Sequence, residues 1–488
     1  MENLENYFNK FRKNIVGIDA EYGTPSGIKK IVYVDWIASG RLYLLIEKAI
    51  VEKFGPFVAN THTETSETGT RMTLSYKYAH ELIKKHVHAG PADVIITAGF
   101  GMTSVVNKLQ RILGLRGRKE VMQSEKSADR PVVFLTHMEH HTNQTSWYET
   151  DADVVVLEPD NNMLVNPNEL KKQLELYKDR TFKIGSFTAC SNVTGIMPPY
   201  YKLARLMHEY GGLCFVDFAA SAPYEDMDMH PIDPMEKLDA LFFSPHKFLG
   251  GPGSSGVLIF DSSIYKNAVP DDPGGGTVDW TNPWGLYKYV DDIELREDGG
   301  TPGFLQAIRT ALAINLKEEM KTVMIKAREK ELLKIAFEEF KKIPEIKILA
   351  GQHENRLGII SFYHPAIHYN LIVKLLSDRY GVQVRGGCAC AGTYGHFLLK
   401  VSHERSKEIT DKITHGDLSE KPGWVRLSLH PTLTNNELLF VMQAIGEIVK
   451  NYKEWQHDYR YLKNKNEYVH VDDQGTAKRE IESWFDLS

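Results

Sequence analysis

Apolar segments of strand length alternate with helical patterns along the first two thirds of the chain. After an expected strand at 31–36, further strands are expected at 93–97, 132–136, 153–157, 182–187, 213–218, 238–244 and 256–260. Helical patterns at 103–113, 166–177 and 200–210 separate several of these strands. Buried strands that alternate with helices are typical of a mostly parallel α/β sheet, so we expect this class for the larger part of the chain.

A second unit is expected after this sheet, because the pattern changes near residue 305. A long helical pattern spans about 304–341, and strand and helix patterns that end with an amphipathic helix at 434–452 follow it. The predicted parts are an N-terminal arm that packs with the small domain (1–30), a large domain (31–305), a smaller α+β domain (306–452) and a C-terminal extension (453–488). Two polar stretches, 114–130 and 402–422, are expected to be surface insertions.

Composition and charge exclude several classes of protein. The 488 residues hold 58 Lys and Arg against 64 Asp and Glu, so the net charge of −6 favours neither nucleic acid nor an anionic membrane surface. No apolar segment approaches the length of a membrane span, and the polar N-terminus lacks a signal-peptide core. Four cysteines are too few for a disulfide framework, so we expect a protein of the reducing cytoplasm.

One lysine lies in an unusual position, between an apolar strand and a glycine-rich turn. It is Lys247, in the segment LFFSPHKFLGGPGSSGVLIF (241–260). A cofactor can be held at the carboxyl edge of such a strand, and a buried lysine with a lowered pKa can form a Schiff base. Taken alone, the pattern fits equally well a lysine whose stem is buried and whose ammonium reaches solvent.

Two further features complete a pattern expected for pyridoxal phosphate (PLP). Asp217 follows the apolar residues of LCFVDF (213–218), where its carboxylate can pair with a protonated pyridine nitrogen. The segment DVIITAGFGMTSVVNKL (93–109) indicates a strand, a glycine-rich turn and a helix whose first amides, with Thr103, can bind phosphate. Each feature alone is more common as an ordinary turn, but together they describe a PLP site.

Eight segments carry a family resemblance in a consistent order. They are YVDWIASGR, AGFGMTSVVN, LTHMEHHTNQTSW, ACSNVTGIMPP, SPHKFLGGPGSSGVL, EDGGTPGFLQAI, VRGGCACAG and WVRLSLH, between about residues 31 and 452. They resemble the cysteine desulfurase family, in its branch with selenocysteine lyases, within the class V aminotransferase group of fold-type I PLP enzymes. The resemblance implies a type I PLP-dependent transferase fold, with a mostly parallel seven-stranded sheet in the large domain and a smaller α+β domain.

The resemblance also implies roles for individual residues by matching position. Lys247 would bind the cofactor covalently, Asp217 would pair with its ring nitrogen, and His140 would stack on the ring. Asn192 would lie beside the phenolic oxygen or the substrate carboxylate, which Arg426 would bind with its bidentate fork, and Arg385 would lie near the site. The expected phosphate ligands are Gly101, Met102, Thr103, Ser244 and His246, together with Thr301 from the other subunit of a homodimer.

The segment VRGGCACAG (384–392) holds two of the four cysteines on a glycine-flanked loop. By the resemblance, Cys390 is the nucleophile that takes sulfur from L-cysteine as a persulfide, leaves L-alanine, and passes sulfur to an acceptor protein. Cys388 would relay a persulfide or only fill space. A disulfide between them would be strained, whereas two small buried residues at a strand end stay an alternative. No metal is expected, because HMEHH (137–141) directly follows a strand and lacks a second ligand cluster.

Departures from the family pattern leave the reaction open. Ala220 stands where the family has Gln or His near the phenolic oxygen, and Ser221 is a candidate to replace that group. Three hypotheses remain: a cysteine desulfurase; another class V enzyme (an aminotransferase, β-lyase or epimerase) that needs Lys247 and Asp217 but not Cys390; and a sulfur-carrier or assembly protein on this fold. The true substrate, the sulfur acceptor and the roles of the insertions and the C-terminal extension are not determined by the sequence.

Overall fold

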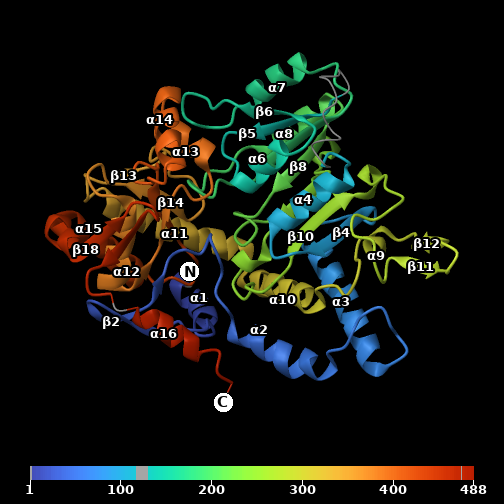
Figure 1. Cartoon of the computed structure of the whole chain (residues 1–488), viewed down its shortest axis with the longest axis horizontal. Coiled ribbons are helices and arrows are strands. Elements are labelled where there is room, and N and C mark those ends of the chain that lie inside the picture. Colours follow the sequence, from blue (N-terminus) through green and yellow to red (C-terminus); the bar gives the residue numbers. More distant parts are fainter. Residues whose placement is uncertain (1–2, 117–129, 474, 488) are drawn as a thin grey trace.

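The computed structural model describes residues 3–116, 130–473 and 475–487, and within these ranges seven strands form one large sheet (Figure 1). Their order is β4 (Asp93–Ala98), β10 (Gly256–Asp261), β9 (Ala240–Phe243), β8 (Leu213–Asp217), β7 (Lys183–Thr188), β5 (Val132–Thr136) and β6 (Asp153–Leu157). β10 runs antiparallel to both of its neighbours, and the other pairs are parallel. The predicted α/β class and the mostly parallel seven-stranded sheet are confirmed.

Helices cover both faces of this sheet, because its strands are apolar on both sides. Along β5, Val132 and Phe134 belong to one buried cluster and Val133 and Leu135 to another, as the alternation of side chains along a strand requires. The first face packs against α3 (Glu67–His86), α7 (Pro167–Leu176), α8 (Tyr200–Glu209) and α10 (Phe304–Met320), and the second against α4 (Met102–Ile112) and α6 (His141–Tyr148). In such layered folds ligands bind at the carboxyl edge of the parallel strands.

A second, antiparallel sheet lies beside the first. It consists of β13 (Lys347–Ile348), β14 (Ile359–Tyr363), β17 (Trp424–Ser428) and β16 (Arg385–Gly387), packed with α11 (Thr322–Phe340), α12 (Tyr369–Tyr380) and α15 (Asn435–Trp455). Next to α12, β3 (Val32–Tyr33) pairs in parallel with β15 (Val382–Gln383). The strand expected at 31–36 is therefore shorter than predicted, and it lies with the second sheet although we expected the large domain to begin at 31. Its ladder ends where Asp35 forms an isolated bridge with Ser428.

The helical pattern expected over 304–341 is interrupted at Lys321. α10 ends at Met320, α11 begins at Thr322, and Lys321 between them has a φ of 60°, in the left-handed region. This conformation costs a non-glycine residue about 1–2 kcal/mol. Met320 is buried with the first sheet, whereas Leu332 is buried with the second. The single helix that we predicted is wrong, because the break lets one helical segment serve two cores.

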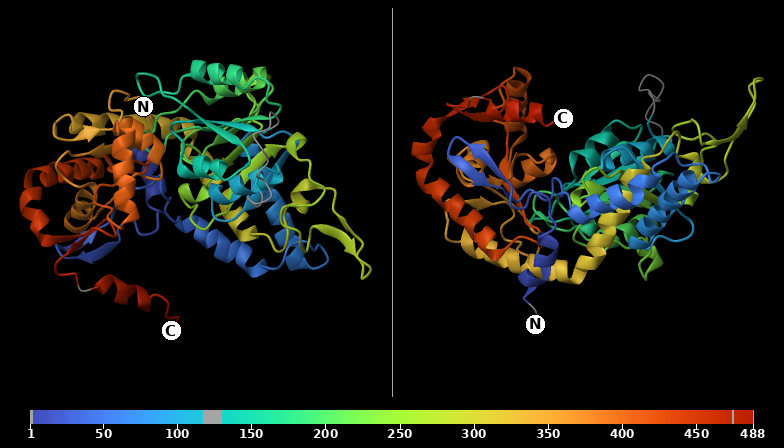
Figure 2. Two further views of the ribbon diagram at one scale, coloured as in Figure 1. Left: turned by 45° about the horizontal axis from the view of Figure 1, so that its top comes forward. Right: turned by 90° about the horizontal axis from the view of Figure 1, so that it is seen from below.

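Smaller elements surround the two sheets. Near the N-terminus they are α1 (Leu4–Arg12), the hairpin of β1 (Glu21–Thr24) and β2 (Gly27–Lys30), and α2 (Leu44–Ala49), which continues into a π-turn at Ile50–Phe54. The hairpin of β11 (Val278–Thr281) and β12 (Tyr287–Tyr289), followed by α9 (Ile293–Arg296), projects from the molecule (Figure 2). The expected insertion 402–422 contains α14 (His403–Thr414), whereas residues 117–129 of the other insertion, 114–130, lie outside the described ranges.

The C-terminal extension forms the hairpin of β18 (Tyr459–Leu462) and β19 (Glu467–His470), followed by α16 (Thr476–Ser483). The hairpin packs on α12 through its turn, where the Asn466 side-chain amide donates to the Tyr369 hydroxyl at 2.6 Å. The extension therefore belongs structurally to the second sheet. Throughout the described ranges, no helix is long and apolar enough to cross a membrane.

Candidate active site

A cavity of about 220 Å³ lies at the carboxyl edge of the large sheet, where residues of the second sheet meet it. The predicted site residues that line it are Met102, Thr103, His140, Asn192, Asp217, Ser244, His246, Lys247, Arg385, Cys390 and Arg426. They come from segments that follow β4, β5, β7, β8 and β9 and from β16, β17 and the loop after β16. Apart from Gly101, Ser221, Thr301 and Cys388, the structure thus brings together the candidate site residues that the sequence singled out.

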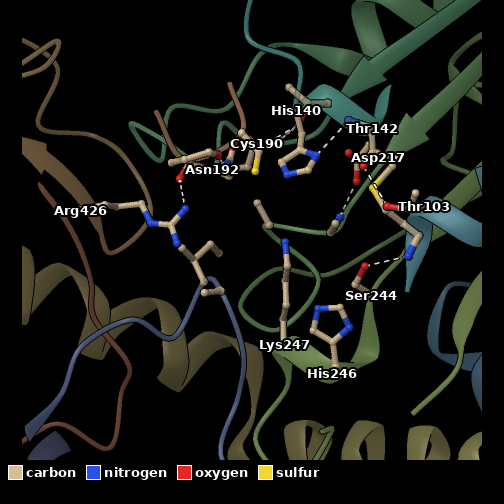
Figure 3. Close-up of a pocket in the computed structure, with 18 of the residues that line it drawn as sticks. Thr103, His140, Thr142, Cys190, Asn192, Asp217, Ser244, His246, Lys247 and Arg426 are labelled. Carbon is tan, nitrogen blue, oxygen red and sulfur yellow. Dashed lines mark hydrogen bonds between the residues drawn. The ribbon is translucent and has the colours of Figure 1, made fainter. Parts of the chain in front are cut away.

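Lys247 projects from the short turn after β9 into the centre of this cavity (Figure 3). The turn is compact because glycine permits a close approach of the backbone, and a Cβ on Gly251 would collide with the Pro245 carbonyl oxygen. Burial lowers the pKa of Lys247 to about 8, although the Asp217 carboxylate acts in the opposite direction. The amine is therefore close to its neutral, nucleophilic form at mildly alkaline pH.

Asp217 ends β8 at the wall of the cavity, and its surface is 3% exposed. Its Oδ1 accepts a hydrogen bond from the Ala219 N–H at 2.8 Å. Burial raises the pKa of Asp217 to about 6, and the charge of Lys247 limits the rise. A carboxylate this deeply buried requires a cationic partner to stay ionised, and a protonated ring nitrogen would be one.

The N-terminus of α4 forms another wall and has the features of an anion site. Gly101 precedes the helix without a side-chain cap, and the Met102 N–H donates to Ser244 Oγ at 2.9 Å. A Cβ on Gly101 would lie 3.0 Å from His246 Cε1 and 3.2 Å from Ser244 Oγ, so glycine is what keeps this space open. The helix dipole, its first amides and the hydroxyls of Ser244 and Thr103 together favour a phosphate group.

His140 and Asn192 lie beyond the Lys247 amine (Figure 3). Nδ1 of His140 accepts a hydrogen bond from the Thr142 N–H at 3.1 Å, and burial, with a smaller effect of Lys247, lowers the pKa of His140 to about 3. Its ring is therefore neutral. The Asn192 amide donates to the Ala389 carbonyl at 2.7 Å, whereas Asn192 Oδ1 is buried and has no partner in the described part of the chain. Buried polar atoms are almost always paired, so this oxygen indicates that a ligand completes the site.

Arg426 enters the cavity from β17 and is bound to Asp35. Its Nη2 lies 2.9 Å from Asp35 Oδ1, and its Nη1 donates to the Asn192 carbonyl at 3.2 Å. Arg385 Nε lies 3.3 Å from Asp35 Oδ2, so one carboxylate holds both guanidinium groups. Among the described residues nothing accepts from the buried Nε of Arg426, which leaves a donor for a substrate carboxylate.

The loop after β16 holds Cys388 and Cys390 and is anchored on the large sheet. The Ala391 N–H donates to the Cys388 carbonyl at 3.0 Å across a turn whose central residues, Ala389 (φ 49°) and Cys390 (φ 56°), are both left-handed. The His141 N–H donates to the Cys390 carbonyl at 2.7 Å. The hydrogen bond from the Asn192 side-chain amide to the Ala389 carbonyl adds a second anchor. These bonds hold a strained turn that places Cys390 at the cavity.

Two expectations from the sequence do not fit this cavity within one chain. Thr301 is exposed, and its hydroxyl donates to Asn60 Oδ1 at 3.3 Å, so its role in a partner subunit stays a prediction. Ser221 is buried but does not line the cavity, and its hydroxyl has no partner among the described residues. The idea that Ser221 replaces the family Gln or His is therefore wrong, and Ala220 presents only a methyl group to the cavity.

Sequence reasoning missed four residues of this site: Asp35, Thr142, Thr188 and Cys190. Asp35 lies in a segment that the sequence did single out, but its contact with Arg426 spans 391 residues and leaves no local pattern. Thr142 Oγ1 lies 2.9 Å from Thr103 Oγ1 and extends the anion site. Thr188, the last residue of β7, and Cys190, two residues further on, line the cavity with their side chains buried.

A family model described as Aminotransferase class-V matches residues 32–440, and the chain belongs to this family. Curated proteins similar to it include a probable cysteine desulfurase of Halalkalibacterium halodurans, 26% identical over 366 residues that cover 74% of this chain and 84% of that protein. A cysteine desulfurase of Haloferax volcanii is 25% identical over 404 residues, which cover 78% and 88%. Among solved structures, an apo cysteine desulfurase of Thermococcus onnurineus has the same fold, with a TM-score of 0.71 at 20% identity over 91% of this chain and 98% of that chain.

Proposed function

We propose that this protein is a PLP-dependent cysteine desulfurase, which converts L-cysteine to L-alanine and takes the sulfur onto Cys390 as a persulfide. The observation that carries the proposal is that Lys247, Asp217 and Cys390 line one cavity although they are far apart in the sequence. The names of the similar proteins support the same reaction.

The residues of the cavity fit PLP. Lys247 would hold the cofactor covalently, Asp217 would pair with its ring nitrogen, and the neutral His140 would cover the ring. The N-terminus of α4 would bind the phosphate together with Thr103, Ser244 and His246. Asn192 Oδ1, which has no partner among the described residues, would accept a hydrogen bond from a bound ligand. When bound, PLP supplies an electron sink that makes the α-proton of an amino acid acidic and its carbon–sulfur bond labile.

The chain itself would orient the substrate and move protons and sulfur. Arg426 would bind the substrate carboxylate through its unpaired Nε, with Arg385 beside it. Lys247 Nζ, whose pKa of about 8 suits a general base near neutral pH, would take the proton from Cα and later return a proton. Cys390 Sγ would form a bond to the substrate sulfur as the carbon–sulfur bond breaks, so that the sulfur stays on the enzyme and alanine leaves.

Further parts of the proposal concern organisation and context. The proposed organisation is a large domain at 31–305 and a small domain at 306–452, although β3 lies with the second sheet and α10 is buried with the first sheet as far as Met320. The exposed position of Thr301 supports a homodimer in which this residue completes the phosphate site of the partner subunit. We place the reaction in the cytoplasm and expect an acceptor protein to receive the sulfur.

The test is an assay of alanine and sulfide with L-cysteine, a thiol reductant and the PLP-loaded enzyme. We expect the wild type to form alanine, Lys247→Ala to lose both activity and the visible absorbance of lysine-bound cofactor, and Cys390→Ser to keep that absorbance but lose desulfuration. Cys214→Ser, which removes a buried thiol on β8, is the matched control and keeps full activity. Absence of alanine from the wild type would refute the proposal.

One observation favours a second candidate, another class V reaction such as transamination, β-elimination or epimerisation. Ala220 lines the cavity where the cysteine desulfurase pattern has Gln or His, so one polar contact near the ring is missing. Equal product formation by Cys390→Ser and wild type would support this alternative, because such reactions use Lys247 and Asp217 but no enzyme thiol.

A further inference from the structure

A second and larger cavity, of about 750 Å³, opens on the other side of the cysteine loop and forms an outer groove. Cys390 lines both this outer groove and the inner cavity that holds Lys247, whereas Cys388 lines the outer groove and not the inner cavity. The two thiols therefore stand in sequence along one path from the inner cavity to the outside.

Part of the wall of the outer groove comes from segments of the chain that the family resemblance does not explain. The family match ends at residue 440, and the β18–β19 hairpin at 459–470 lies beyond it. The turn of this hairpin meets the segment 415–421 of the polar insertion, since the Leu418 N–H donates to the Lys463 carbonyl at 3.1 Å. The Tyr369 hydroxyl of α12 donates to the Lys421 carbonyl at 3.1 Å and closes the third side. The groove is thus a built feature of this chain.

The loop places the two cysteines two residues apart in one tight turn, a spacing that does not favour a bond between them. Cys388 and Cys390 occupy the first and third positions of the turn that is closed by the Ala391 N–H. A disulfide between residues two apart would close a small, strained ring, so the pair is better suited to exchange of sulfur than to a lasting bond. Cys388 is half-buried, and Cys390 is exposed toward the groove.

Charged side chains of both signs line the groove. Lys374, Arg385, Lys421 and Lys465 line it, against Glu467 and Asp473. Lys374 and Arg385 have carboxylate partners in Asp378 and Asp35. Lys421 and Lys465 therefore remain as basic side chains of the groove beside the acidic Glu467 and Asp473.

We propose that Cys388 is a second sulfur-carrying residue, which receives sulfur from Cys390 and presents it in the outer groove to an acceptor thiol. This inference rests on the proposed desulfurase function. The Cys388 thiolate attacks the outer sulfur of the Cys390 persulfide, a sulfur–sulfur bond forms on Cys388 while the one on Cys390 breaks, and Cys390 leaves as a thiolate. The transfer needs no oxidant, because one sulfane sulfur moves between two thiolates.

The test is a single turnover with less than one equivalent of ³⁵S-labelled L-cysteine on the PLP-loaded enzyme, without reductant. The reaction is quenched at short times with an alkylating reagent, and the added sulfur is assigned to Cys388 or Cys390 by tandem mass spectrometry, which fragments the peptide that holds both residues. In the wild type we expect the label on Cys390 first and on Cys388 later. In Cys388→Ser the label stays on Cys390 with an undiminished burst of alanine, and in Cys390→Ser neither residue is labelled. Cys214, which is buried and lines neither cavity, serves as an internal control for unspecific transfer.

The outcomes separate the relay from the reaction on which it rests. Alanine with label on Cys390 but none on Cys388 at any time would overturn the relay and leave the desulfurase in place. Label on Cys388 in the Cys390→Ser variant would also overturn it, because Cys388 would then take sulfur directly from the substrate. Absence of both alanine and label would refute the desulfurase function itself. A supporting result is a several-fold fall in steady-state sulfide release in Cys388→Ser when dithiothreitol is the acceptor.

Discussion

Replacing Lys247 with Met should stabilise the protein in its cofactor-free form, although it abolishes function. Burial holds the pKa of Lys247 at about 8 in the folded chain, against 10.5 for a lysine side chain in water. Between these two values the unfolded state binds more protons than the folded state, so stability of the wild type rises as the pH increases through this window. Methionine has a similar length and carries no charge, so the variant lacks this dependence.

The magnitude follows from the difference between the two pKa values. With about 1.36 kcal/mol per pKa unit, the variant should exceed the wild type by about 3 kcal/mol at pH 7, about 2 kcal/mol at pH 9 and about 1 kcal/mol at pH 10. The value at pH 7 is an upper limit, because the side chain keeps some exposure to the cavity.

The assay is urea unfolding of cofactor-free protein, followed by tryptophan fluorescence at pH 7, 9 and 10. Lys202→Met, which removes an exposed lysine on α8, controls for the change of residue type and should show no such trend. A variant that is less stable than the wild type at pH 7, or a difference that grows with pH, would contradict the assignment of Lys247 as an amine whose pKa is lowered by burial.

Three further predictions concern residues around the same cavity. Asp35→Asn removes the carboxylate between two guanidinium groups, and the free energy of unfolding should fall by about 3–5 kcal/mol in urea titrations; a loss within error would show that Arg426 finds another partner. Ala389→Gly relieves a left-handed residue with a φ of 49° and should stabilise by about 1 kcal/mol, seen as a higher Tm, unless the turn is held by contacts of the methyl group. Thr301→Ala should weaken PLP binding in the dimer about tenfold, because a hydrogen bond to phosphate contributes about 1.4 kcal/mol, and should leave the Tm of cofactor-free protein unchanged. An unaltered affinity for PLP would argue against a role of Thr301 in the partner subunit.

The large sheet could be predicted because its strands are buried on both sides and stand out as short apolar segments. All seven expected strands after residue 90 correspond to strands of the structure, with ends that differ by at most two residues. The prediction failed at Lys321, a charged residue with good helix propensity that takes a left-handed conformation. It does so because the helices before and after it pack in different cores. It also failed at 31–36, where local pattern could not show that the partner strand is β15.

The inner cavity could be predicted as far as its residues carry chemistry in the sequence. Lys247 and Asp217 are recognisable because polar groups directly after apolar strands are unusual. Asp35 and Thr142 were not recognised, since their roles consist of contacts with other side chains that only the fold brings close. The outer groove could not be predicted at all, because it depends on the packing of a C-terminal hairpin against an insertion.

The pairing of β3 with β15 has a consequence for the order in which the chain can fold. Val32 is among the first residues to be synthesised, and its strand partner Val382 appears only when most of the 488 residues exist. Because a growing chain folds from its N-terminus, this segment must wait in an unpaired state while the large sheet forms. The long-range pair thus delays completion of the part of the active site that holds Arg385 and Arg426 until synthesis is nearly finished. Fragments that end before residue 380 should form the part that holds Lys247 and Asp217 but lack the part that holds the two arginines.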